Sequence, residues 1–465
     1  MKKYNIYVTN PNGIPRVNEP IEVKLDFEQG ATYQNFYLEN SLGEKIPFQM
    51  YDEIYQNNRL TAATLVFISF FDKDSCVYSL INTDEKYEME NMEGIKSLDV
   101  TQEDGFTRLD TGYYELELCS GKADGTASGK WGIRFFENIK ERKNLIKDYS
   151  NAIGGFYGPF FTPKNGLINP PEHVKVEIKV EVVGPLYHRY RFIGKIPNGL
   201  DEKLFDKSFE IIWEFYYKSP IFRRQYIVDD FETVVDGMPV VNKITVGDEF
   251  ESGQGELVFN KFLSYGTTTY REGDLYANIL ADNVKNILLK DDENVSEAFK
   301  AYKDSIGENI NEVSWDYFWK MFCSQENLLS NDEIKNHVNQ ILPAAHRITH
   351  LGKRNVDIKH RKSVEVNAVP EQTIFPLTSN KTCELNETTG YSMIWYTNNL
   401  VNRFQIVQRK ESGWVNWGTN GENEYPELPV GSIIKTAYGK FDDWESFADT
   451  LEKPLIGYFS LIEGE

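Results

Sequence analysis

The chain has few cysteines, no long apolar run and no apolar N-terminal segment. Its four cysteines, Cys76, Cys119, Cys323 and Cys383, lie far apart without C-x-x-C spacing, which argues against a zinc knuckle and a disulfide framework. No run approaches the roughly 20 apolar residues that a membrane helix needs, and the first residues lack the pattern of a signal peptide. The sequence therefore predicts a protein of the reducing cytoplasm without a membrane partner.

Basic residues are also in short supply. The chain has 71 Asp and Glu against 50 Lys and Arg, and its formal net charge is -21. Binding nucleic acid through its phosphates requires a basic face, so this class of partner is disfavoured. Glycine-rich phosphate loops, G-x-S-x-G elbows and dinucleotide fingerprints are absent. We therefore expect no nucleic-acid partner and no cofactor.

Aromatic residues and alternating patterns are abundant. With 27 Tyr, 29 Phe and 8 Trp in 465 residues, the composition excludes general disorder. Residues 1–100 contain six short strand-like segments separated by turn signals, as at residues 10–13 and 28–30. They predict an N-terminal β-barrel or β-sandwich module.

Residues 101–465 predict a large antiparallel β-sandwich. Residues 174–183 alternate apolar and charged side chains, and two further long strands are predicted over about 186–196 and 209–231. Between about 280 and 343 the apolar spacing becomes helical. The expected fold is mainly β, a small N-terminal β module and a large antiparallel sandwich (supersandwich) with a helical insertion.

Basic and aromatic residues concentrate on the second and third of these strands. Alternation places His188 and Tyr190 on one face and the neighbouring arginines on the other. Removing the proton α to a uronate carboxylate needs such a base beside a cation, and holding a carboxylated sugar needs arginine beside an aromatic ring. The structural alternative is a set of cross-strand pairs. His188 and Tyr190 are candidate catalytic residues, and the candidate substrate-binding residues are Arg223, Arg224 and Tyr226.

His346 and His350 form a second constellation. Their spacing of four residues puts them on the same side of a helix or a strand. The sequence HRITH lacks the glutamate of the H-E-x-x-H zinc motif, so we assign no metal site. We regard either histidine as a candidate catalytic acid, with an ordinary surface or core histidine as the alternative.

Four further residues complete the candidate site. Glu214 lies among apolar residues, where burial would raise its pKa. Tyr157 lies in a loop rich in glycine and proline, and Trp414 and Trp417 are flanked by glycines, so their rings could be offered to a sugar face. Core packing is the alternative for the tryptophans. No carboxylate pair can be chosen by spacing among so many acidic residues.

Several segments have residue patterns that resemble those of a known group of proteins. They are Ile46-Pro47-Phe48-Gln49, Leu65-Val66-Phe67, Tyr78-Ser79-Leu80, Gly184–Phe192 and Tyr216–Tyr226. Over about residues 40–260 the chain resembles galactose-mutarotase-like and exo-rhamnogalacturonan-lyase-like β-supersandwich proteins. The resemblance implies a sugar-binding all-β scaffold and acid/base chemistry by His, Tyr, Arg or Glu. The histidine and glutamate that mutarotase-like enzymes pair have no clear counterpart here, so no catalytic residue is carried over.

Together these features predict a bacterial carbohydrate-active enzyme, a lyase acting on a uronate-containing or otherwise modified oligosaccharide. A glycoside hydrolase or sugar epimerase on the same scaffold is one alternative. A non-catalytic carbohydrate-binding or assembly protein is another. The expected partner is the oligosaccharide, and the sequence gives neither its identity nor the oligomeric state.

Overall fold

The structure, a computed structural model, describes residues 1–465 apart from 73, 87–92, 99–105, 148–150, 157–169, 197–205, 236, 271–272, 274, 307–314, 316–317, 320–355, 422–424 and 462–465. The described residues form two compact units. The first comprises residues 1–265 and 362–465, and the second comprises residues 266–361. The predicted boundary near residue 100 falls inside the first unit.

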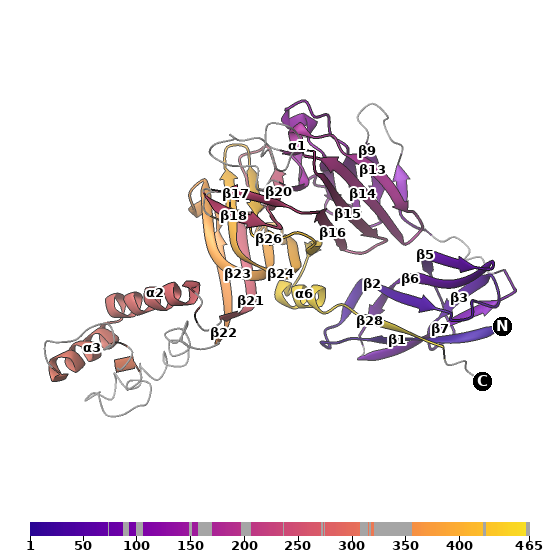
Figure 1. The fold of residues 1–465 in the computed structure, drawn as a ribbon, viewed down its shortest axis with the longest axis horizontal. Coiled ribbons are helices and arrows are strands. Elements are labelled where there is room, and N and C mark those ends of the chain that lie inside the picture. Colours follow the sequence, from indigo (N-terminus) through magenta and orange to yellow (C-terminus); the bar gives the residue numbers. More distant parts are fainter. Residues whose placement is uncertain are drawn as a thin grey trace. The chain divides into compact units, whose positions relative to one another are not determined.

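The N-terminal part of the first unit consists of two small antiparallel sheets, ordered β28-β1-β7-β3-β4 and β2-β6-β5. The last strand of the chain pairs with the first, Tyr458 opposite Tyr7, and the two lie side by side in Figure 1. The strands are β1 (Lys2–Thr9), β2 (Arg16–Asp26), β3 (Asn35–Glu39), β4 (Lys45–Ile46), β5 (Phe48–Gln56), β6 (Arg59–Phe71), β7 (Ser75–Thr83) and β28 (Ile456–Ser460).

The longest apolar run of the sequence forms strand β6. It is the central strand of its sheet, and one of its faces packs in the module core through Leu65 and Phe67. The opposite face is also covered, because Val66 packs with Tyr187 and Tyr216 of the larger sheet. A strand buried on both faces is apolar throughout instead of alternating.

The larger sheet follows the order β13-β14-β15-β16-β27-β24-β25-β20-β12-β11-β10-β9-β8, with β23 paired to β24 and β21 paired to β23. Its strands are β8 (Lys96–Leu98), β9 (Phe106–Asp110), β10 (Tyr114–Cys119), β11 (Gly132–Asn138), β12 (Ile153–Phe156), β13 (Glu177–Val182), β14 (Tyr187–Lys195), β15 (Ser208–Tyr216), β16 (Ile221–Val228), β20 (Val246–Glu251), β21 (Lys261–Tyr270), β22 (Val356–Glu365), β23 (Gln372–Leu385), β24 (Tyr391–Arg409), β25 (Trp414–Gly418) and β27 (Ile433–Lys440).

Shorter elements connect these strands. They are the two-stranded pairs β17 (Glu232–Val235) with β18 (Met238–Val241) and β19 (Lys243–Ile244) with β26 (Leu428–Pro429), the 3-10 turns Ala127–Gly129 and Val366–Ala368, and the helices α1 (Pro170–His173) and α6 (Trp444–Glu452). Helix α6 begins after Asp443, whose side chain accepts from the backbone N–H of Ser446.

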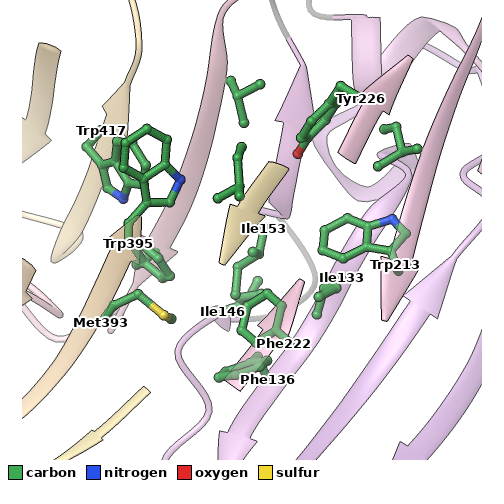
Figure 2. Packing of buried hydrophobic residues seen from close by; sticks show 14 of the residues in the cluster. Ile133, Phe136, Ile146, Ile153, Trp213, Phe222, Tyr226, Met393, Trp395 and Trp417 are labelled. Carbon is green, nitrogen blue, oxygen red and sulfur yellow. The ribbon is translucent and has the colours of Figure 1, made fainter. Parts of the chain in front are cut away.

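The larger sheet packs on itself around an aromatic core. Rings from its two ends meet, with Trp131 and Phe209 at 5.6 Å and Tyr114 and Phe222 at 6.1 Å between centroids. Figure 2 shows this interior, in which Trp213 and Trp395 come from different strands of the sheet. The prediction of a mainly β, antiparallel sandwich fold is confirmed.

One strand prediction was wrong. Residues 209–231 form a hairpin of β15 and β16, seen in Figure 1 beside β14, and not one long strand. The break falls at Lys218, which has a left-handed φ of 52°, shortly before Pro220. Proline has no backbone N–H for a ladder and restricts the residue before it, so the chain turns here.

The second unit contains two described helices, α2 (Leu275–Asp291) and α3 (Glu293–Ile306). Their presence agrees with the helical spacing predicted for this insertion. Phe299 of α3 packs against Trp315 and Phe318, at 5.2 and 5.0 Å between ring centroids. The remainder of the predicted insertion, to residue 343, lies largely outside the described residues.

Candidate functional site

The strands β14, β15 and β16 divide the candidate residues between two faces of the sheet. His188 is opposite Phe215 and faces the interior, as does Tyr190, and each is 1% exposed. Glu214 and Arg223 are opposite each other and lie on the other face. The predicted combination of a His188 base with an Arg223 clamp is therefore not brought together.

The interior-facing His188 reaches an open depression of about 670 Å³. The depression lies between the β8 segment and the turn joining β13 to β14, and its lining is Glu93, Gly94, Ile95, Lys96, Ser97, Val183, Gly184, Pro185 and His188. The two segments are fastened by a hydrogen bond from the Ile95 N–H to the Pro185 carbonyl, 2.9 Å long. They approach so closely that a Cβ on Gly94 would lie 2.7 Å from Pro185.

Hydrogen bonds link the wall of the depression to the buried imidazole. Nδ1 of His188 lies 2.9 Å from the phenol oxygen of Tyr190. A hydrogen bond from the exposed Ser97 hydroxyl lowers the pKa of Tyr190, but burial is the larger effect and raises that pKa to about 12. The three side chains therefore form a relay from the surface to the ring, with the phenol protonated at neutral pH.

Burial also sets the charge of the imidazole. It lowers the pKa of His188 to about 4, although the nearby Gly184 carbonyl favours the protonated ring. His188 is therefore neutral at pH 7. Its Nε2 is buried and has no hydrogen-bond partner among the described residues.

The rim of the depression carries charges of both signs. Glu93 accepts hydrogen bonds from the Tyr217 hydroxyl at 3.0 Å and from Lys218 Nζ at 3.4 Å, and these bonds, that of Tyr217 first, lower the pKa of Glu93. Lys96 is exposed on the same rim. Ammonium, carboxylate and hydroxyl groups thus lie around one open space that also has apolar lining.

Arg224 and Tyr226, both predicted to bind substrate, are buried in the core. The Arg224 guanidinium forms two hydrogen bonds with Asp248, of 2.6 and 2.7 Å, and neither side chain is exposed. The Tyr226 hydroxyl donates to the Gly154 carbonyl at 3.1 Å. Neither side chain is accessible to a ligand from the surface, and both form contacts that stabilise the interior of the sandwich.

The sequence did not identify a buried carboxyl group, that of Glu384, which lies near Arg224 and Asp248. Glu384 is 3% exposed, and neither of its carboxyl oxygens has a hydrogen-bond partner among the described residues. Burial raises its pKa well above the usual range, and the charge of Asp248 adds to this effect. Nothing in the local sequence distinguishes Glu384 from the other acidic residues, because strand pairing alone places it in the interior.

Arg223 is the centre of an ionic network on the opposite face. Its Nε lies 2.9 Å from Glu214, and its Nη2 lies 2.7 Å from Glu22 of β2. Tyr187 donates to Glu214 at 2.5 Å, and Tyr216 donates to Glu22 at 2.9 Å. Both predicted site residues of this face, Arg223 and Glu214, are thus engaged with each other.

A pocket of about 150 Å³ opens beside this network. It lies where β2, β16, β27, the last turn of α6 and the segment after α6 meet. Its lining residues are Glu19, Pro20, Glu22, Ile221, Arg223, Lys435, Thr450, Leu451, Pro454 and Leu455. Lys435 is directly opposite Arg223 in the sheet. Burial, followed by the charge of Arg223, lowers the pKa of Lys435 to about 8. We call this space the joint pocket.

The two candidate tryptophans have different surroundings. Trp417 is 1% exposed and packs in the core, 5.1 Å from Trp395 between ring centroids (Figure 2). Its predicted contact with a sugar is replaced by core packing, because its side of β25 faces the interior. Trp414 is half-buried, and its indole N–H donates to Asn151 at 3.0 Å.

Three predicted site residues, Tyr157, His346 and His350, lie outside the described residues. Among the residues that are described, no group of three or more His, Cys, Asp and Glu side chains could hold a metal ion. In the same part of the chain, no helix has the length and apolar character needed to cross a membrane.

Comparison with known proteins finds similarity only among solved structures. No family model and no curated protein matches the chain. Over its full length it aligns with an alpha-mannosidase from Enterococcus faecalis V583 (TM-score 0.45, 8% identity) and with a glycosyl hydrolase family 38 protein from Enterococcus faecalis (TM-score 0.45, 9% identity). It covers 46% and 48% of those chains, so it spans about half of their length.

A galactose mutarotase-like protein from Clostridium acetobutylicum aligns with 76% of this chain over its own full length, with a TM-score of 0.37 and 9% identity. Galactose mutarotase-like proteins are thus among the solved structures that the chain is similar to, whereas the likeness to rhamnogalacturonan lyases stays a prediction. All these TM-scores are below 0.5, and they assign no activity to this chain.

Proposed function

We propose that this chain is a carbohydrate-active enzyme whose substrate binds in the depression at His188. The observation that carries the proposal is the hydrogen-bonded relay of Ser97, Tyr190 and His188 at the wall of an open depression with charged groups on its rim. A volume of about 670 Å³ is ample for more than one sugar unit. Carboxylate, ammonium and hydroxyl groups match the donors and acceptors of a saccharide.

The proposed reaction is a lyase-type elimination on a uronate-containing oligosaccharide. Tyr190 transfers the proton, because it is protonated at neutral pH, and neutral His188 behind it is the base. The proton α to the substrate carboxylate passes through the Ser97 hydroxyl and the Tyr190 phenol to Nδ1 of His188, and the relay returns a proton through Ser97 to the leaving glycosidic oxygen. The carbon–oxygen bond breaks, a carbon–carbon double bond forms, and no other reactant is needed. Lys96 on the rim would balance the substrate carboxylate.

The lining of the depression disfavours the hydrolase alternative. Hydrolysis of a glycosidic bond by most glycosidases uses two carboxyl groups that flank the bond. Among the described residues that line the depression, Glu93 is the single carboxylate, and it is engaged by Tyr217 and Lys218.

We propose the cytoplasm as the compartment, since Cys76, Cys119 and Cys383 are free thiols.

The proposal is tested by turnover of uronate-containing and neutral oligosaccharides, followed by the ultraviolet absorbance of the new double bond. We expect Ser97→Ala and His188→Gln to reduce kcat by about 10²–10⁴, the usual contribution of acid/base groups. Lys96→Met should mainly raise KM for the acidic substrate, and Lys24→Met, at an exposed lysine of β2, is the control.

Three results would contradict this proposal. Product formed without a double bond would identify a hydrolase. Binding without any product would identify a carbohydrate-binding protein. Full turnover by folded His188→Gln would remove the relay from the reaction, whatever the product.

A further inference from the structure

The joint pocket has a lining that the proposed reaction does not use. It lies on the face of the sheet that carries Arg223, whereas His188 faces the interior. A ligand there would therefore not meet the Ser97–Tyr190–His188 relay. Any role for the pocket must be separate from the elimination.

The size of the pocket excludes a single trapped water as its occupant. A water needs a cavity of about 10–15 Å³, and the joint pocket measures about 150 Å³. The space is therefore suitable for several waters or for one molecule of several heavy atoms.

The charges in its wall are balanced. Two acids, Glu19 and Glu22, face two bases, Arg223 and Lys435. Glu19 is paired with Arg16 at 2.6 Å and accepts the Leu455 N–H at 2.7 Å. Because the lining carries no excess of either sign, it favours a neutral ligand over an anion or a cation.

Polar hydrogens remain available in the wall. Lys435 Nζ donates to the Leu451 carbonyl at 2.6 Å, which is its one hydrogen bond to the described part of the chain and leaves two N–H groups. Arg223 uses Nε and Nη2 for its two carboxylates, and within the same described residues no hydrogen bond involves Nη1. The carboxylates of Glu19 and Glu22 have further lone pairs. Donors and acceptors thus face the same space.

Apart from Thr450, the rest of the wall is apolar, formed by Pro20, Ile221, Leu451, Pro454 and Leu455. A pyranose ring combines these two properties, because its hydroxyl edge needs donors and acceptors while its C–H face packs on apolar groups. We propose that the joint pocket is a second binding site, for one neutral polyhydroxyl molecule of about monosaccharide size.

The test is calorimetric titration of the full chain with galactose, glucose, mannose and glycerol, and with galacturonate and phosphate as charged probes. We expect at least one neutral polyol to bind with one site per chain and the charged probes to bind more weakly. Lys435→Met should weaken this binding by about tenfold, the effect of losing one hydrogen bond to a charged group. Thr450→Val should weaken it less, and Lys440→Met, at an exposed lysine of the same strand, should leave it unchanged.

Three outcomes overturn the proposal. Absence of binding by all neutral probes would mean that the pocket holds only water. Tighter binding of phosphate or galacturonate would contradict the argument from charge balance. Polyol binding that persists in Lys435→Met but is lost in His188→Gln would place the sugar in the depression; because that variant alters the relay only, the second site and the proposed elimination can fail separately.

Discussion

At the scale of single residues, the two adjacent arginines of β16 have opposite environments. Arg224 is fully buried with Asp248, and Arg223 lies in a partly exposed network with Glu214 and Glu22. Strand alternation accounts for the difference, since neighbouring side chains point to opposite faces. The sequence identified both as functional candidates, but it could not tell which face would be closed by the core.

Removing Arg224 should be strongly destabilising. Arg224→Met would leave the Asp248 carboxylate buried without its cation, which costs about 3–5 kcal/mol of unfolding free energy. Urea unfolding measures the change. As a control, Lys195→Met removes the exposed pair with Asp206 and should change stability by less than about 1 kcal/mol. Equal losses in the two variants would contradict this account of the buried pair.

At the scale of elements, β28 completes the N-terminal module. It pairs with β1 and contributes Phe459 to the packing of the module core. Gly457 faces inward, where a Cβ would lie 2.4 Å from the side chain of Val23. Tyr458, the next residue, points outward and is 57% exposed. The fit of β28 against β2 therefore depends on the absence of a side chain at residue 457.

We expect Gly457→Val to displace β28 from the module. The added side chain would overlap Val23, and such overpacking typically costs about 1–3 kcal/mol. Hydrogen exchange should become faster at the β1 amides that pair with β28. Tyr458→Val changes the same strand on its exposed face, and comparable acceleration there would show that the effect is not steric.

At the scale of the whole molecule, pH should act on stability through His188. Its pKa is about 4 in the folded chain and about 6.5 when unfolded. The unfolded chain binds more protons between these values, so stability rises with pH through this window and is lost as the pH falls from about 6.5 to about 4.

The loss attributable to this histidine is on the order of 3 kcal/mol. It is measured as the difference between the pH–stability curves of the wild type and His188→Gln, which share all other titrating groups. The difference should be constant above about pH 7 and should shrink below it. A difference independent of pH would mean that folding does not lower the pKa of the ring.

The sequence alone determined the fold class and most strands, because alternation and turn residues are local signals. Period-2 patterning placed His188 and Tyr190 on one face, and the structure shows that this face is the buried one. The same patterning predicted one strand where the structure has β15 and β16. It did not identify the turn at Lys218, which has a left-handed φ and precedes Ser219-Pro220.

Only the tertiary structure decided which candidates meet. It joined Ser97 to Tyr190 and His188 across about ninety residues of chain, and it set Lys435 beside Arg223 through strand pairing. It also enclosed Trp417 in the core and brought Glu384 near Arg224. Such contacts depend on how distant strands pair and on which face of the sheet is covered. Neither property can be inferred from the residue pattern of a single segment.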